Sequence, residues 1–137
     1  MITMAETTAP VTPALAEEQE RLDSLGSRYV DVDAMEWQPT PTAGIHMKVL
    51  MKDEANGRLT ALIRWSPGAS LALHRHNDIE QSYVLEGSLC DHEGECKAGQ
   101  FVWRPAGSEH RAWSPNGAVL LAIFLKPNTF LEGERAD

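Results

Sequence analysis

Residues 68–87 of the chain read GASLALHRHNDIEQSYVLEG, and residues 99–110 read GQFVWRPAGSEH. In the first stretch His74, His76 and Glu80 are separated by even numbers of residues, so on a single β-strand their side chains would all point to one face. Titratable side chains gathered on a buried face are costly unless a metal ion binds them. The second stretch ends on one further histidine. Together the two stretches predict a metal site with four ligands: His74, His76, Glu80 and His110.

Nine positions in these stretches match the two consensus motifs of the cupin family at the family's spacing, so the chain resembles a cupin. The matching residues are Gly68, His74, His76, Glu80, Gly87, Gly99, Pro105, Gly107 and His110. At a tenth position the family has an asparagine and this chain has Ser114. That asparagine is not a metal ligand, so the difference concerns hydrogen bonding in the local turn. The resemblance implies an all-β jelly-roll barrel, also called a double-stranded β-helix.

The strand patterns in the rest of the sequence agree with an all-β fold. Residues 45–52 and 58–65 each alternate apolar and polar side chains, and Asn56-Gly57 between them predicts a type I′ hairpin turn. Residues 118–125 are apolar throughout, as expected of a strand packed between the core and a subunit interface. Because cupins commonly dimerise, the resemblance also implies a homodimer.

The alternation in residues 79–86 is less regular. It predicts a face on the ligand side and a second face that packs behind it: Glu80, Ser82 and Val84 on the first, and Ile79, Tyr83 and Leu85 on the second. Four side chains are predicted to line a pocket for a flat or apolar substrate: Trp65, Ser82, Val84 and Trp103. His46 is interpreted as exposed or at an interface rather than as a further ligand. Arg64 and Arg104 are interpreted as ordinary charges at the surface or the barrel rim.

The N-terminal residues 1–27 differ in composition from the remainder. Residues 1–13 are rich in threonine, alanine and proline, and residues 14–25 have helical composition. We therefore expect a flexible N-terminal arm with a short helix over 1–27, followed by a cupin domain over 28–137.

The overall composition is that of an ordinary globular chain, with 42% hydrophobic and 23% charged residues among 137. The net charge of −8 argues against nucleic acid or an anionic membrane as a partner, since both attract basic proteins. The longest apolar run, 118–125, is too short to cross a bilayer, and no secretory signal is visible. A cytoplasmic location follows as the default expectation.

Cys90 and Cys96 flank the turn at residues 91–95. A small disulfide across a hairpin and a metal cluster with His92 are both conceivable. Two free thiols in a reducing compartment are the favoured interpretation.

The predicted ligand set suits a divalent transition metal such as Fe, Mn, Ni, Cu or Zn, and the sequence does not choose among them. Four protein ligands on an octahedral ion would leave two positions for water, substrate or O₂. One carboxylate ligand leaves a divalent ion with a formal excess of about one positive charge. Such a centre would attract a small substrate or ligand with anionic oxygen donors.

Two stretches, 84–88 (VLEGS) and 105–110 (PAGSEH), resemble a narrower branch of the cupins. This branch contains the cupin domain of zinc-dependent anti-sigma factors and small dioxygenases similar to those that cleave acetylacetone and dihydroxyacetophenone. The diketone-cleaving enzymes are similar without sharing the glutamate ligand, which this chain keeps as Glu80.

These resemblances imply two principal functions. The first is a non-haem metal-dependent dioxygenase acting on a small enolisable or aromatic oxygen compound, with the metal centre itself as the catalytic group. The second is a zinc-binding sensor or regulatory module that acts through a partner supplied in trans. A third, sugar isomerisation or epimerisation as in metal-free cupins, agrees poorly with an intact ligand set.

Overall fold

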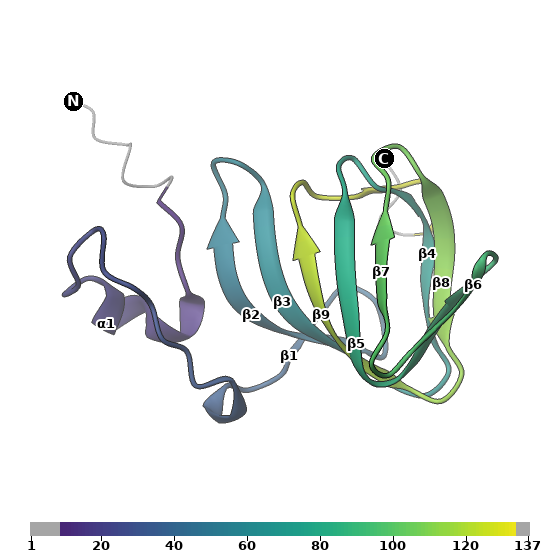
Figure 1. Cartoon of the computed structure of the whole chain (residues 1–137), viewed down its shortest axis with the longest axis horizontal. Helices are drawn as coiled ribbons and strands as arrows, with labels where there is room; N and C mark the ends of the chain where they lie inside the picture. Colours follow the sequence, from purple (N-terminus) through teal and green to yellow (C-terminus); the bar gives the residue numbers. More distant parts are fainter. Residues whose placement is uncertain (1–8, 134–137) are drawn as a thin grey trace.

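The fold consists mainly of antiparallel β-strands (Figure 1). The computed structural model describes residues 9–133 of the chain. The strands are β1 (Gln38–Pro39), β2 (Ile45–Asp53), β3 (Arg58–Trp65), β4 (Ala69–Arg75), β5 (Glu80–Asp91), β6 (Gly94–Lys97), β7 (Phe101–Arg104), β8 (Glu109–Ser114), β9 (Ala118–Phe124) and β10 (Thr129–Phe130). Within the described part, helical structure is limited to α1 (Ala16–Gln19) and to 3-10 turns at Pro13–Leu15 and Val32–Ala34. None of these helices is long and apolar enough to cross a membrane.

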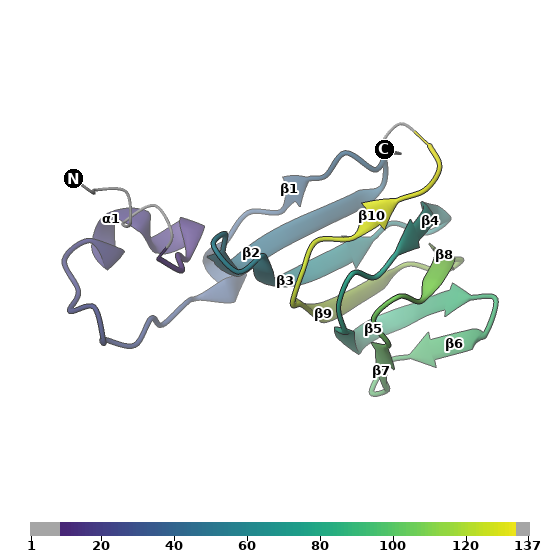
Figure 2. The same cartoon turned by 90° about the horizontal axis from the view of Figure 1, so that it is seen from above.

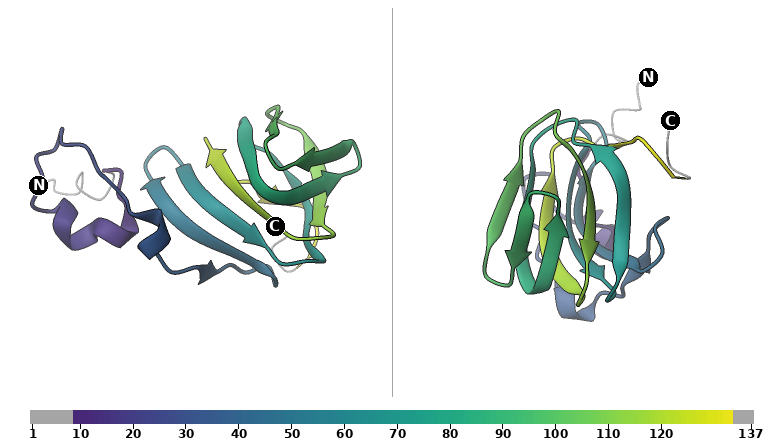
Figure 3. Two further views of the ribbon diagram at one scale, coloured as in Figure 1. Left: turned by 60° about the horizontal axis from the view of Figure 1, so that its bottom comes forward. Right: turned by 90° about the vertical axis from the view of Figure 1, so that its right-hand side faces the viewer.

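The strands form one sheet that curls over into two facing layers (Figures 2 and 3). Their order is β1-β2-β3-β9-β5-β8-β4-β10, with β6 and β7 also paired to β5. The long strand β5 belongs to both layers, because its first part pairs with β9 and β7 and its last residues pair with β6 and β8. This topology confirms the predicted all-β jelly-roll barrel.

The barrel core confirms the predicted alternation in β3 and in the first part of β2, but a register shift between Val49 and Met51 interrupts the alternation in the rest of β2. Ala61, Ile63 and Trp65 of β3 are buried, with Ile45 of β2 beside them. The prediction of a type I′ turn at Asn56-Gly57 was wrong. Asp53 pairs with Arg58 across four intervening residues, and only glycines among the described residues have positive φ. The Asp53 carboxylate accepts a hydrogen bond from the Asn56 side chain at 2.9 Å, which stabilises this longer turn.

The expectation that His74, His76 and Glu80 lie on one strand was also wrong. Strand β4 ends at Arg75, and Glu80 is the first residue of β5. The chain turns between them because Asn77 donates side-chain hydrogen bonds to the 127–129 segment and Asp78 accepts one from the backbone of Ile79. The ligand residues therefore converge from separate elements rather than from one strand face.

The face behind the ligand side of β5 is exposed rather than packed. Ser82 and Val84 point into the barrel and are buried, as predicted. In contrast, Tyr83 and Leu85 are 41% and 48% exposed, and Ile79 is exposed as well. The prediction failed because none of the described elements covers the outer side of this strand.

The N-terminal segment forms a loop beside β2 and away from the rest of the barrel (Figures 1 and 2). Its helix α1 is shorter than the composition of residues 14–25 predicts. Val11 exchanges two backbone hydrogen bonds of 2.8 Å with Lys52 of β2, which attaches the start of this loop to the barrel. Residues 1–8 of the predicted arm lie outside the described residues.

The two cysteines are free, as favoured from the sequence. In the β5–β6 hairpin Cys96 is opposite Leu89 and Cys90 is opposite Glu95, so the two thiols do not face each other. Ser114, which stands where cupins have asparagine, is completely buried and donates a 2.7 Å hydrogen bond to the Ser88 carbonyl. A serine thus serves the local hydrogen bonding at this position.

Candidate metal centre

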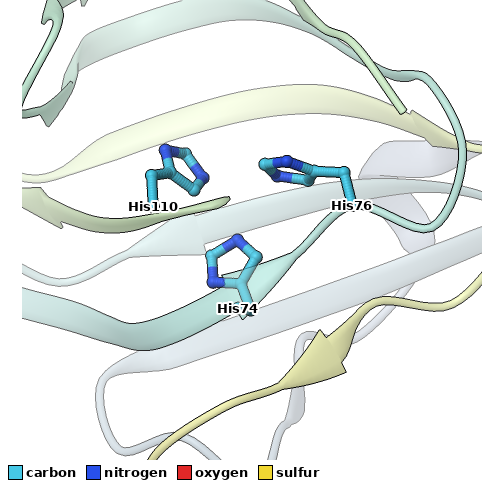
Figure 4. Close-up of side chains that lie close together, drawn as sticks. All are labelled: His74, His76 and His110. Atoms are coloured by element: carbon cyan, nitrogen blue, oxygen red, sulfur yellow. The ribbon is translucent and has the colours of Figure 1, made fainter. Parts of the chain in front are cut away.

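Three buried histidines meet inside the barrel (Figure 4). One nitrogen from each of His74, His76 and His110 lies within 4.8 Å of the other two. The side chains are at most 4% exposed, and their ring centroids are 4.7 to 5.0 Å apart. Neutral imidazoles at this separation can bind a single metal ion.

The pairing of β4 with β8 brings these histidines together. His74 in β4 is directly opposite His110 in β8, and opposite residues of an antiparallel pair have adjacent side chains. His76 follows β4, and two backbone hydrogen bonds attach it to the turn before β8: its N–H donates to Ser108 and its carbonyl accepts from Gly107. The second motif therefore positions both its own histidine and one from the first motif.

Each ring is held through its Nδ1 atom. The partners are the Ala72 carbonyl for His74 at 2.7 Å, the Ser108 carbonyl and hydroxyl for His76 at 3.0 and 2.9 Å, and the Asp91 carboxylate for His110 at 2.8 Å. The carbonyl and carboxylate oxygens can only accept, so Nδ1 carries the proton in each neutral ring. The unprotonated nitrogen is then Nε2, which is the arrangement that metal-binding histidines adopt.

The protonation of the site also favours metal binding. Burial, with the neighbouring charges of His110, His74 and Arg104, lowers the pKa of His76 to about 3 despite its hydrogen bond to Ser108. Burial likewise lowers the pKa of His110 to about 4, although its hydrogen bond to Asp91 opposes this shift. Both rings are therefore neutral at pH 7. The buried Nε2 of His76 has no hydrogen-bond partner, a deficit that a metal ion would remove.

Glu80 lies at the edge of the histidine cluster. Its Oε1 is 3.6 Å from Nε2 of His76 and accepts a 3.3 Å hydrogen bond from the side chain of Asn128. Burial raises the pKa of Glu80, although the hydrogen bond from Asn128 and the charge of Arg104 lower it. A divalent cation in the cluster would favour the ionised carboxylate.

Asp91 and Arg104 form a buried charged pair next to the cluster. Arg104 Nη1 donates to Asp91 Oδ2 at 2.7 Å, and the same oxygen accepts from His110. The backbone N–H groups of Glu93 and Gly94 donate to the other oxygen at 2.8 and 3.0 Å. Burial alone would raise the pKa of Asp91, but the hydrogen bond from His110 and the charge of Arg104 hold it below its ordinary value.

The interpretation of Arg104 as a rim charge was wrong, since it is 9% exposed. From the sequence, Asp91 was expected only to be part of the turn at residues 91–95. Alternation along β7 was a usable signal, because Val102 and Arg104 share the inner side of that strand. The pairing of Asp91 with His110 had no such signal, since it depends on two strands that are far apart in the sequence.

An apolar cavity of about 630 Å³ opens onto His74, Glu80 and His110. Its walls include the side chains of Met47, Trp65, Leu71, Phe124 and Phe130. A cavity of this size and character suits a small, largely apolar molecule.

The four predicted pocket residues lie in different places. Trp65 lines the apolar cavity, whereas Ser82 and Val84 are buried in the barrel wall outside its lining. Trp103 is 56% exposed and borders a separate open hollow beside β6 and β7.

His46 and Arg64 lie on the other side of the sheet from the cluster. His46 is half-buried, and it is paired with Arg64 across β2 and β3. Arg64 stacks over the ring of Trp37, with its guanidinium carbon 4.7 Å from the ring centroid. Neither residue contributes to the candidate metal centre.

A jelly-roll barrel with three inward histidines from the motifs described above is the architecture of a cupin. Residues 26–129 match the family model of the ChrR cupin-like domain, and the chain belongs to this family. No curated protein is significantly similar to the chain.

Several solved structures have the same fold. A candidate acetylacetone dioxygenase from Methylibium petroleiphilum PM1 is 24% identical, with a TM-score of 0.74, over 82% of this chain and 85% of that chain. The acetylacetone dioxygenase of Acinetobacter johnsonii is 21% identical, with a TM-score of 0.72, over 80% and 81%. The anti-sigma factor ChrR, in complex with SigE of Rhodobacter sphaeroides, is 20% identical, with a TM-score of 0.58, over 68% of this chain and 50% of that chain. At these identities the similarity establishes the fold.

Proposed function

We propose that this chain is a small metal-dependent oxidoreductase of the dioxygenase type. His74, His76, His110 and Glu80 would hold one divalent transition metal, and the substrate would be a small enolisable or aromatic compound with oxygen donors. The observation that carries this proposal is the position of the histidine cluster. Two of its members, His74 and His110, line an apolar cavity together with Glu80, and His76 offers a nitrogen within 4.8 Å of theirs.

The protein residues would have distinct roles in this reaction. A bound divalent metal supplies Lewis acidity and, when redox-active, electron transfer between substrate and O₂. The cavity walls exclude water and hold the apolar part of the substrate. Glu80 lies at the cavity beside the cluster and would accept the proton that an enolisable substrate loses. Asp91 and Ser108 keep His110 and His76 in fixed orientations.

Substrate charge also follows from the cavity lining. Next to the cluster the cavity is lined by His74, His110 and Arg104, which are neutral or positive, and by one acidic residue, Glu80. A loaded centre would therefore attract an enolate or phenolate oxygen more strongly than a cation. Acetylacetone, the compound named for two of the structural neighbours, belongs to this chemical class.

The first test concerns the metal. Protein purified without added ions should contain about one transition-metal ion per chain, counted by elemental analysis. His74→Ala and His110→Ala should each lower that content at least about tenfold, because each removes one of few ligands. His92→Ala is the matched control, since His92 is exposed on the turn before β6. Unchanged metal content in both cluster variants would contradict the proposed site.

The second test concerns turnover. Oxygen uptake by the iron-loaded chain is measured with a panel of β-diketones, hydroxyketones and catechols. We expect uptake with at least one member of the panel and none with the His110→Ala variant. If no compound of the panel supports oxygen uptake although the chain holds one metal ion, the proposed oxidoreductase function is wrong.

The alternative function is a zinc-binding regulatory module. The matched family is named for ChrR, and one structural neighbour is an anti-sigma factor bound to its sigma factor. Under this alternative the cluster would hold zinc as a structural or ligand-gated ion, and a partner protein would be supplied in trans. Tight zinc binding together with no oxygen uptake would favour it.

A further inference from the structure

The apolar cavity beside the histidine cluster is large compared with a simple diketone. Acetylacetone has five carbon and two oxygen atoms, whereas a cavity of about 630 Å³ has room for roughly 20 water molecules at about 30 Å³ each. Pockets of this volume generally bury most of a ligand of drug size. Apolar atoms of a longer ligand would favourably displace the water that acetylacetone leaves between apolar walls. The volume therefore indicates a ligand with an apolar part well beyond its oxygen donors.

The titratable side chains of the cavity wall belong to two separate groups. The first group lies at the histidine cluster: His74, Glu80, Arg104 and His110. The second group belongs to the β2–β3 hairpin: Lys52, Asp53, Glu54 and Arg58. The hairpin group meets solvent, since Lys52 and Glu54 form an exposed ion pair of 3.2 Å. The cavity thus has one polar end inside the barrel and a second polar end at the surface.

Strand register joins these two ends by an apolar path. Glu80 of β5 is opposite Phe124 of β9. Phe124 is opposite Leu59 of β3, and Leu59 is opposite Lys52 of β2. All four residues line the cavity, and opposite residues share a face of the sheet, so they form one row. The row spans three inter-strand steps, or roughly 14 Å along the sheet, with Leu59 and Phe124 between its polar ends.

Further apolar side chains enclose the space over this row. In the same layer, Leu120 is opposite Ile63, and Ile63 is opposite Met47. The facing layer, with β4 and β10 (Figure 2), contributes Leu71 and Phe130 to the cavity wall. An apolar chain or ring that lies on the row would therefore contact apolar walls from both layers instead of water.

We propose that the substrate of this site is elongated, with its oxygen donors at the histidine cluster and an apolar chain or ring on Leu59 and Phe124 that points towards Lys52. For the chemistry of the oxygen-bearing end, this inference rests on the proposed function. The substrate class is then a 1,3-dicarbonyl or phenolic compound with an alkyl or aryl substituent, rather than acetylacetone itself. The exposed pair of Lys52 and Glu54 sets the outer limit, because an apolar chain that extended past it would enter water.

Calorimetric titration of the metal-free full chain tests the apolar end of the site without metal or turnover. The probes are 2,4-pentanedione, which is acetylacetone, and 2,4-nonanedione, which has the same diketone group and a longer alkyl chain. We expect the nonanedione to bind at least about 15-fold more tightly, since each methylene group that is buried contributes a factor of roughly two to four. Equal affinities for the two diketones would overturn the proposal.

Variants of Leu59 locate the bound chain. Leu59→Trp should remove most of the preference for the nonanedione, because the larger side chain fills the space between Glu80 and Lys52. Leu59→Phe is the milder replacement and should reduce the preference in the same direction. Leu62→Trp is the matched control, since Leu62 is half-buried on the same strand but does not line the cavity. Full preference in both Leu59 variants would overturn the proposal, as would an equal loss in Leu62→Trp.

Oxygen uptake by the iron-loaded chain separates this inference from the proposed function. A chain that prefers the nonanedione but consumes no oxygen with any diketone would contradict the oxidoreductase and still support the apolar end of the site. Oxygen uptake with acetylacetone, together with equal affinity for both diketones, would support the oxidoreductase and overturn the elongated substrate.

Discussion

Asp91 is the residue on which the orientation of His110 depends. One of its oxygens accepts hydrogen bonds from both His110 and Arg104, and its other oxygen is held by two backbone N–H groups. With every oxygen engaged, the carboxylate is fixed, and it keeps the proton of His110 on Nδ1. Asp91 is thus a positioning residue: unlike Glu80, it does not line the apolar cavity.

We expect Asp91→Asn to weaken metal binding about 10- to 100-fold, the usual effect of removing the carboxylate behind a metal-binding histidine. An amide can offer its N–H to His110 and so favour the wrong tautomer. The dissociation constant is measured by competition with a chelator, and the absorption spectrum of the Co(II)-loaded chain reports the coordination directly. Asp53→Asn is the matched control, since Asp53 is equally buried but lies in the β2–β3 hairpin. Equal loss of affinity in both variants would mean a general effect on folding.

The sequence identified the histidines of the cluster but not the residues whose hydrogen bonds orient them. His74, His76 and His110 are recognisable from motif spacing, and the structure brings these three together. The hydrogen bond between Asp91 and His110 joins β5 to β8, which a single sequence cannot pair. Ser108 illustrates the same limit: it precedes His110 by two residues yet binds His76.

The elements of the barrel show why even spacing in the first motif misled the strand assignment. Residues at i, i+2 and i+6 share a face only if the strand is continuous, and Asn77 and Asp78 end it. Glu80 still reaches the cluster because it is the first residue of the next strand, β5, which pairs with β9. Alternation predicted β3 correctly because one face of that strand is buried, whereas a register shift between Val49 and Met51 interrupts the alternation in β2.

Strand β5 crosses from one layer to the other at Gly87, and this crossing requires a glycine. Gly87 has φ +68°, and a Cβ atom there would lie 1.9 Å from the Gly117 carbonyl oxygen. We expect Gly87→Ala to destabilise the chain by about 3 kcal/mol or more in urea unfolding, because strain adds to a backbone clash. Gly68→Ala is the control: φ is +85° but no atom lies within 4 Å, so it should cost only about 1–2 kcal/mol. Equal costs would show that the clash is relieved.

For the whole molecule, the histidine cluster couples global stability to pH and to metal. In the apo chain a neutral cluster is compatible with burial, whereas a protonated one is not. Net charge is −8, so a divalent cation inside the barrel also reduces the self-repulsion of the folded chain. Metal binding should therefore raise the unfolding temperature by mass action, and a chelator should reverse the rise.

The pH dependence of the apo chain follows from the two lowered pKa values. Unfolded histidines gain protons near pH 6.5, while His76 and His110 in the folded chain stay neutral down to about 3 and about 4. The unfolded state thus binds more protons in this window, and the free energy of unfolding should fall as the pH drops from about 6.5 towards 4. The pKa of Glu80 is raised by burial, so at pH values above the ordinary pKa of a glutamate its protonation in the folded chain opposes this slope. Urea midpoints of the apo chain at several pH values measure the slope, and His76→Gln should reduce it. An apo chain whose stability is constant between pH 6.5 and 5, or a variant with an unchanged slope, would show that the cluster is not buried and neutral.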